Sequence, residues 1–257
     1  MSTNFIAFKT IARREVVRIL RIWGQTLVPP AITMTLYFLI FGKLIGSRIG
    51  DMGGFDYMAF IVPGLVMMSV IQNAYGNISS SFFGAKFGRH VEELLVSPMP
   101  NHVILAGYVT GGVLRGLMVG IIVLIIGMLF TPVRIPHPLI MISTILLGAT
   151  IFSLAGFVNA VYAKKFDDIA IVPTFILTPL TYLGGVFYSV RVLPEWAQMA
   201  TKANPIFYMV NAFRYGLLGE NATDVSIWVS YGVMLVFVVL LGVLGLFLLK
   251  RGIGLRS

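Results

Sequence analysis

Residues 57–85 read YMAFIVPGLVMMSVIQNAYGNISSSFFGA, and no charged residue lies between Asp56 and Lys86. An α-helix needs roughly 20 apolar residues to cross the hydrocarbon core of a bilayer. The stretch is longer than that minimum and carries no charge. It therefore predicts a membrane-spanning helix at about residues 58–83.

The remaining charges fall in clusters that are separated by similar uncharged runs. Only 11% of the residues are charged and 58% are hydrophobic, so the charged fraction is about half that of a soluble domain. A β-barrel would show short alternating segments instead. We therefore expect an all-α integral membrane protein made of one domain, residues 1–257. Six spans are expected, at about residues 25–44, 58–83, 102–130, 138–162, 169–188 and 225–249.

The N-terminal segment, residues 4–23, is expected to lie on the membrane without crossing it. Apolar side chains recur there at helical spacing, namely Phe5, Phe8, Ala12, Val16, Ile19 and Trp23. Arg14, Arg18 and Arg21 fall on the opposite side. A basic amphipathic helix of this kind lies in the headgroup plane, and an ordinary soluble helix is the alternative.

Residues 189–219 are expected to form two short helices at the outer surface or re-entering the membrane. The segment is fairly apolar, but no uncharged run in it is long enough to span. Its charges and helix-breaking prolines are Arg191, Pro194, Glu195, Lys202, Pro205 and Arg214.

The distribution of basic residues predicts the orientation. With the amino terminus inside, the cytoplasmic segments carry twelve Lys and Arg and the outer segments carry six. This excess agrees with the positive-inside rule, so both termini are expected in the cytoplasm. The net charge of +9 has the same explanation and does not require a nucleic-acid partner.

The sequence contains little that predicts catalysis. There is no cysteine and no GxxxxGK[ST] phosphate-binding loop, so this chain is not expected to hydrolyse nucleotides itself. His90, His102 and His137 lie on different segments without carboxylates at metal-ligand spacing. We expect no catalytic residue, no metal site and no cofactor bound by this chain.

The segment 84–100, GAKFGRHVEELLVSPMP, is a short charged connection between two spans. Phe87, Val91, Leu94 and Leu95 are predicted to share one helical face, with Arg89, Glu92 and Glu93 in water. Such a helix fits either of two roles. It can dock in a groove of a partner protein, or it can rest on the membrane as a solvated loop helix.

Arg115 is expected near the middle of the third span, where a charge costs about 2.5–3.5 kcal/mol. A small-residue face accompanies it, made of Gly112, Gly116 and Gly120. One interpretation places Arg115 on a transport path or a dimer seam. The other pairs it with backbone carbonyls or with the polar face of the second span, where Asn73, Asn77 and Ser80 recur at helical spacing.

Asp167 and Asp168 stand at the start of the fifth span, after a tight loop with two lysines. Acidic groups suit the positive end of a helix dipole, so capping is one role for them. Contact with a partner, as a second coupling loop, is the other.

With these features together, the sequence resembles the ABC-2-type transport permeases, the membrane subunits of ATP-binding-cassette exporters, and within them the YadH-like subgroup. The resemblance covers nearly the whole chain, from the amphipathic N-terminal helix through the six spans. Its most specific elements are Arg89, Glu92, Glu93 and Pro98 in the charged loop, Asp168-Ile169 and PTFILTPLTYLGGVFY (173–188) in the fifth span, and the outer Asn204-Pro205 and Arg214.

The resemblance implies the fold of type V exporters and a place in a bacterial inner membrane. It implies a homodimer with two copies of a separate ATPase subunit, which binds ATP and magnesium. The coupling helix would be segment 84–100, with contacts from Phe87, Arg89, Glu92, Glu93, Leu94 and Leu95.

Family cargoes range from polysaccharides and lipo-oligosaccharides to hydrophobic drugs, so an amphipathic cargo is implied. Asn73, Tyr75 and Asn77 are candidates to line its path, and the outer helices with Glu195, Asn204, Pro205 and Arg214 would cap the exit. The alternative is a self-contained secondary transporter or channel. That class calls for paired carboxylates within the membrane, which these predicted spans lack.

Overall fold

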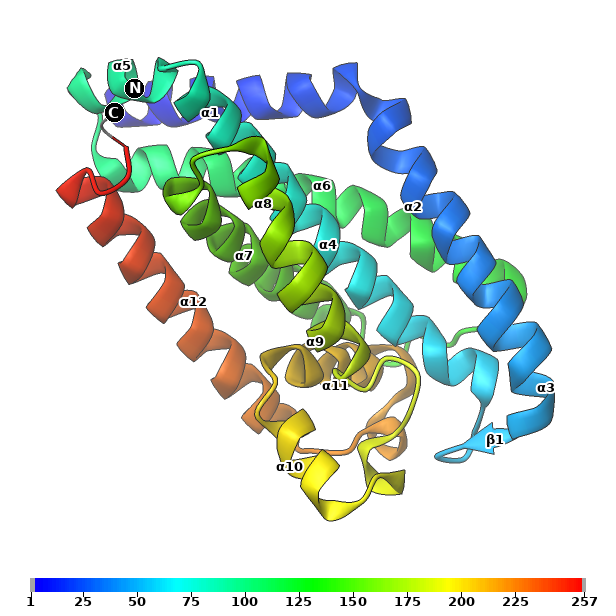
Figure 1. The fold of residues 1–257 in the computed structure, drawn as a ribbon. Coiled ribbons are helices and arrows are strands. Elements are labelled where there is room, and N and C mark those ends of the chain that lie inside the picture. Colours follow the sequence, from blue (N-terminus) through cyan, green and yellow to red (C-terminus); the bar gives the residue numbers. More distant parts are fainter. Residues whose placement is uncertain (1–2, 256–257) are drawn as a thin grey trace.

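The computed structural model describes residues 3–255, which are built almost entirely of helices (Figure 1). The longer helices are α1 (Thr3–Arg21), α2 (Trp23–Tyr37), α4 (Tyr57–Phe87), α6 (Asn101–Phe130), α7 (Pro138–Tyr162), α11 (Pro205–Leu218) and α12 (Ile227–Arg251). The shorter α-helices are α3 (Gly46–Ile49), α5 (His90–Val96), α8 (Phe166–Val172), α9 (Thr178–Tyr182) and α10 (Glu195–Lys202). Two π-helical segments, η1 (Phe38–Ile45) and η2 (Pro173–Leu177), and two 3₁₀ turns, η3 (Val190–Val192) and η4 (Glu220–Ala222), complete the helical elements. Strands β1 (Asp51–Met52) and β2 (Phe55–Asp56) form a small antiparallel hairpin.

The long helices run between two ends of a bundle (Figure 1). At one end, α1 lies across the bundle, close to α5 and to the last turn of α12. We call this the α1 end. The hairpin, α10 and α11 gather at the opposite end, which we call the α10 end.

Five helical stretches are long and apolar enough to cross a membrane. They are Trp23–Ile49, Tyr57–Phe87, Asn101–Phe130, Pro138–Tyr162 and Ile227–Arg251. Each corresponds to one of the expected spans, so the all-helical membrane fold is confirmed for this part of the chain.

The expected fifth span at 169–188 is wrong in its bounds. The continuous helix α8–η2–α9 begins at Phe166 and ends at Tyr182. It ends early because the chain turns at Gly185, whose φ of +73° is open to glycine and strained for other residues. This helix is shorter than the roughly 20 residues of a full crossing, so a sixth crossing stays a prediction.

Helix α4 is the centre of the bundle and packs most extensively against α6 and α7. Nearly all of its membrane-length window is buried by neighbouring helices. Its polar residues explain this placement, because Asn73 and Asn77 would lose hydrogen bonds if they faced lipid. The sequence predicted one shielded face, and the fold shields almost the whole helix.

The small-residue face of α6 packs inside the chain. A Cβ atom at Gly120 would lie 2.6 Å from Val70 Cγ2 of α4, and one at Gly116 would lie 3.2 Å from Ala74 Cβ. A second pair on the same helix, Gly107 and Gly111, faces α1. These glycines therefore bring three helices of one chain close together, which leaves the face unavailable as a seam between two copies.

Candidate functional site

The charged segment 84–100 is divided between two helices. Helix α4 continues to Phe87, and Gly88 and Arg89 then reverse the chain before α5 begins at His90. Arg89 has a φ of 61°, the one positive value for a non-glycine residue among those described. The predicted common face is therefore wrong for Phe87, because this turn sets it on a different helix from Leu94 and Leu95.

Helix α5 turns its apolar face inward. Val91 is only 2% exposed and packs in the core at the α1 end, with Leu94 and Leu95 half-buried beside it. Glu92 and Glu93 are exposed on the other face. Because the apolar face of α5 is already covered, a partner protein would contact its exposed carboxylates and not its leucines.

The loop between α7 and α8 and the start of α8 pack against the last turns of α4, directly before α5. The Phe166 ring packs edge-on against Phe83, with centroids 5.0 Å apart, and lies 5.1 Å from the Phe87 ring. The Lys86 ammonium donates hydrogen bonds to the carbonyls of Val161 (2.6 Å) and Ala163 (2.7 Å). Two connections that are far apart in sequence thus form a continuous face.

This face contains a cavity of about 450 Å³. Most of its lining residues are basic or aromatic, namely Phe83, Lys86, Phe87, Arg89, Tyr162 and Lys164. Glu92, Gly254 and Leu255 complete the lining. Within the described residues, the cavity therefore joins the turn before α5 to the loop before α8 and to the segment that follows α12.

Asp168 caps the start of α8. Its carboxylate accepts hydrogen bonds from the backbone amides of Lys164 (2.7 Å) and Lys165 (3.0 Å). These bonds hold the pKa of Asp168 below its ordinary value, because they stabilise the charged form. Asp167, the residue before it, is exposed. The two acids thus separate into a capping group and an outward-facing one.

A buried carboxylate fixes α1 to the bundle. Glu15 lies between Ile11 and Ile19 on the buried stripe of α1 and is 1% exposed. It accepts hydrogen bonds from Ser81 Oγ (2.7 and 2.8 Å) and from Arg18 (2.9 Å). Arg18 in turn donates to Asn77 Oδ1 at 2.8 Å, so both residues tie α1 to α4.

Sequence reasoning missed Glu15. The available signal was its spacing, since Ile11, Glu15 and Ile19 recur every fourth residue and a carboxylate within an apolar stripe needs a partner. Nothing in the sequence named Ser81 as that partner. Asn77, a candidate path residue, instead belongs to the attachment of α1 in this conformation.

Arg115 lies beside the polar face of α4. It lines a cavity of about 310 Å³ together with Gln25, Pro29, Pro30, Thr33, Met34, Gln72 and Asn73. Its Nε atom is buried without a hydrogen-bond partner, and no hydrogen bond from its guanidinium to a described residue is present. Tyr75 is buried in the hydrophobic core of the bundle. Of the proposed path residues, the structure therefore brings Asn73 and Arg115 together and sets Tyr75 apart.

An aromatic cluster connects α2 and α9 towards the α10 end. The hydroxyls of Tyr37 and Tyr182 are hydrogen-bonded to each other. Phe187 packs on Phe41 and on Tyr182, with centroids 4.7 and 5.7 Å apart. π-Helical segments often mark functional sites, and here η1 directly follows Tyr37 while η2 runs directly into α9.

Asn204 holds the start of α11 against the end of α9. Asn204 caps α11 by accepting from the Ile206 amide (3.0 Å), and its Nδ2 donates to the Leu180 carbonyl (2.6 Å). Pro205 is the first residue of α11, where its missing amide hydrogen costs nothing.

Arg214 is fully buried at this end of the bundle, and it donates to the Gly185 carbonyl at 2.8 Å. Its guanidinium lies 3.9 Å from the centre of the Phe60 ring. Glu195 is exposed in the first turn of α10. The structure thus contains two helices, α10 and α11, in the segment 189–219, and Asn204 and Arg214 hold α11 in place. Their location on the outer side of the membrane stays a prediction.

The comparisons with known proteins agree with this architecture. The family model described as ABC-2 type transporter matches residues 6–218 of the chain. This chain belongs to the ABC-2 type transporter family. The expected family is therefore confirmed.

The relatives are membrane permeases and nodulation proteins. The permease is 59% identical over 257 residues, the full length of both chains, to the inner membrane transport permease YadH of Escherichia coli strain K12. It is 22% identical over 249 residues to nodulation protein J of Neorhizobium galegae, covering 96% of this chain and 90% of the relative. It is 26% identical over 221 residues to nodulation protein J of Rhizobium leguminosarum bv. trifolii, covering 84% and 82%. The ABC-2 permease is thus a multi-pass transport component of the bacterial inner membrane.

Proposed function

We propose that this permease forms the translocation path of an ATP-binding-cassette exporter as a homodimer, driven by two copies of a separate ATPase subunit. The observation that carries this proposal is the composite surface at the α1 end. Phe166 at the start of α8 packs on Phe83 and Phe87 at the end of α4, and one cavity joins the turn before α5 to the loop before α8. A single docking surface lets one ATPase subunit act on two connections at once. ATP and magnesium bind to the partner subunit in this scheme.

The proposal places the α1 end in the cytoplasm. Eleven described Lys and Arg residues lie in the segments at that end, in keeping with the positive-inside rule. In this orientation α8–η2–α9 makes the sixth crossing together with the turn at Gly185, and α10 and α11 cap the outer face. The cargo is amphipathic, in the lipid-, glycan- or drug-like range.

Replacing both Glu92 and Glu93 with Ala is expected to weaken docking of the ATPase, because these carboxylates form the exposed face of α5. The tagged permease would be purified from gently solubilised membranes of its own source. We expect less co-purifying ATPase subunit and lower ATPase activity per permease, with the permease itself at normal levels.

The matched control replaces two exposed carboxylates at the α10 end, Glu195 and Glu220, with Ala. This control removes the same charge from the opposite side of the membrane and is expected to leave the complex intact. Full ATPase recovery and activity with the Glu92 and Glu93 variant would remove the docking role from α5.

Replacing Arg115 with Leu is expected to lower activity while leaving stability unchanged or higher. A charge within the membrane costs about 2.5–3.5 kcal/mol, and here no described residue repays that cost with a hydrogen bond. The measurements are ATPase activity of the complex and the thermal unfolding midpoint of the permease, with Arg115→Lys as the charge-retaining control. A Leu variant that unfolds earlier and keeps its activity would show that Arg115 is structural.

A further inference from the structure

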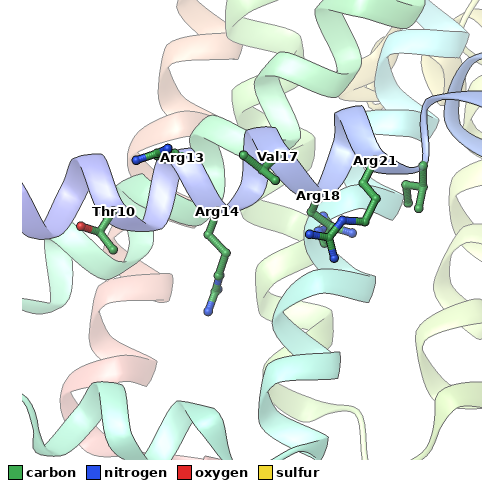
Figure 2. A pocket seen from close by; sticks show the side chains of 7 residues that line it. Thr10, Arg13, Arg14, Val17, Arg18 and Arg21 are labelled. Carbon is green, nitrogen blue, oxygen red and sulfur yellow. The ribbon is translucent and has the colours of Figure 1, made fainter.

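Helix α1 carries a row of arginines that the docking surface and the transport path do not use. In Figure 2, the side chains of Arg14 and Arg21 point to the same side of α1. A cavity of about 540 Å³ opens among them, lined by Thr10, Arg13, Arg14, Val17, Arg18, Arg21 and Ile22 (Figure 2). This volume lies within the range of about 300–1,000 Å³ that is usual for small-ligand sites.

The positive charge of this cavity is largely uncompensated within residues 3–255. Glu15 is the one carboxylate that pairs with these arginines, through Arg18 at 2.9 Å and Arg14 at 3.5 Å. That carboxylate is buried and also accepts hydrogen bonds from Ser81. Four guanidinium groups surround the cavity, so a net positive potential remains that attracts an anion.

Arginine suits a phosphate group in particular. Its planar guanidinium donates two parallel hydrogen bonds to phosphate oxygens, which a lysine ammonium does not match. All the basic residues that line the cavity are arginines. Arg13 and Arg21 make no hydrogen bond or ion pair with another described residue, so their donors face the cavity or solvent.

The surroundings of the cavity are apolar. Leu20 on α1 is more than half exposed, and so is Trp23, the first residue of α2. Val28 and Ile32 are also exposed, further along α2. Free inorganic phosphate gains no binding free energy from these apolar side chains. A phospholipid fits both the arginine-lined cavity and the apolar surface beside it. Its acyl chains can lie along α2 while its phosphate headgroup binds the arginines.

We propose that Arg13, Arg14, Arg18 and Arg21 form a binding site for the phosphate headgroup of an anionic membrane amphiphile in the leaflet that contains α1. This site needs no ATPase subunit, so its test is separate from that of the proposed function. The amphiphile lies at the junction of α1 and α2, where it fixes the height of α1 at the membrane surface.

The test uses the full-length permease in nanodiscs, with Trp23 as the reporter. Trp196 and Trp228 are both exposed and are replaced by Phe, which leaves one tryptophan two residues from Arg21. Brominated phosphatidylglycerol or brominated phosphatidylcholine, at equal fractions in unlabelled phosphatidylcholine, quenches Trp23 in proportion to its local concentration. We expect stronger quenching by the phosphatidylglycerol.

The decisive variant is Arg13→Gln with Arg21→Gln, because neither residue contacts Glu15. The preference for phosphatidylglycerol is expected to fall about fivefold for each arginine removed. Arg13→Lys with Arg21→Lys verifies that the fold is intact and is expected to keep part of the preference. Lys250→Gln with Arg251→Gln removes the same charge at the α1 end, outside the cavity, and is expected to change nothing at Trp23.

Three outcomes would overturn the proposal. Equal quenching by the two lipids would show that no anionic headgroup is selected. An equal loss in the Lys250 and Arg251 control would reduce the effect to general surface charge. Removal of the preference by inorganic phosphate, at an ionic strength matched with sodium chloride, would show that the site takes free phosphate in place of a lipid.

Discussion

Linking residues 37 and 182 to each other is expected to reduce the ATPase activity of the assembled transporter to near background, and cleaving the link is expected to restore it. The hydroxyls of Tyr37 and Tyr182 meet between α2 and α9, towards the end that we place outside. If cargo leaves between these helices, they must separate in each cycle. A permanent link holds them together and so blocks the cycle.

The chain contains no cysteine, so Tyr37→Cys with Tyr182→Cys introduces the only two thiols. A short bis-methanethiosulfonate reagent spans the gap left by the two rings, and a reducing agent removes it. ATPase activity of the purified complex is measured before linking, after linking and after reduction.

The controls separate linking from substitution. Each single cysteine variant, treated with the reagent, reports the effect of modification alone. Arg191→Cys with Glu220→Cys places a link within one cavity at the same end, where it does not connect α2 to α9. Full activity in the linked 37–182 variant would show that α2 and α9 stay together throughout the cycle.

Replacing Glu15 with Leu is expected to destabilise the attachment of α1 by about 1–3 kcal/mol, the cost of leaving buried polar groups unsatisfied. Ser81 and Arg18 both lose their acceptor, although Arg18 keeps its bond to Asn77. The side chain of Arg18 is 30% exposed, so water offsets part of the loss. The expected result is a lower thermal unfolding midpoint and easier proteolysis of α1.

Glu15→Gln is the matched variant, because the amide oxygen can still accept from Ser81. It is expected to lie between the wild type and Glu15→Leu in unfolding midpoint. Lys9→Leu removes an exposed charge from the same helix and is expected to have little effect. Wild-type stability and protease resistance in Glu15→Leu would show that the Glu15 carboxylate is not needed to hold α1.

The sequence by itself determined the membrane-spanning helices. The expected bounds 138–162 coincide with α7, and α4 and α6 begin one residue before their predicted starts. Insertion into a bilayer depends on the length and charge of a continuous run, which is a local property of the chain. The polar residues of α4, such as Asn73 and Asn77, also predicted that part of this helix is shielded from lipid.

The end of the helix that was predicted as the fifth span required tertiary structure. The run 169–188 reads as one apolar segment, but its helix stops at Tyr182. The turn that follows is held by Arg214, which donates to the Gly185 carbonyl from 29 residues further along the chain. A pattern read along one segment contains no information about that distant donor.

The candidate site was decided by tertiary structure in the same way. Glu15 bonds to Ser81, which lies 66 residues away in the sequence, and Phe166 reaches Phe83 and Phe87 on another helix. Such contacts depend on the rotation and height of each helix relative to its neighbours. Close packing at glycines such as Gly107 and Gly111 fixes that register, and hydrophobic periodicity alone leaves it open.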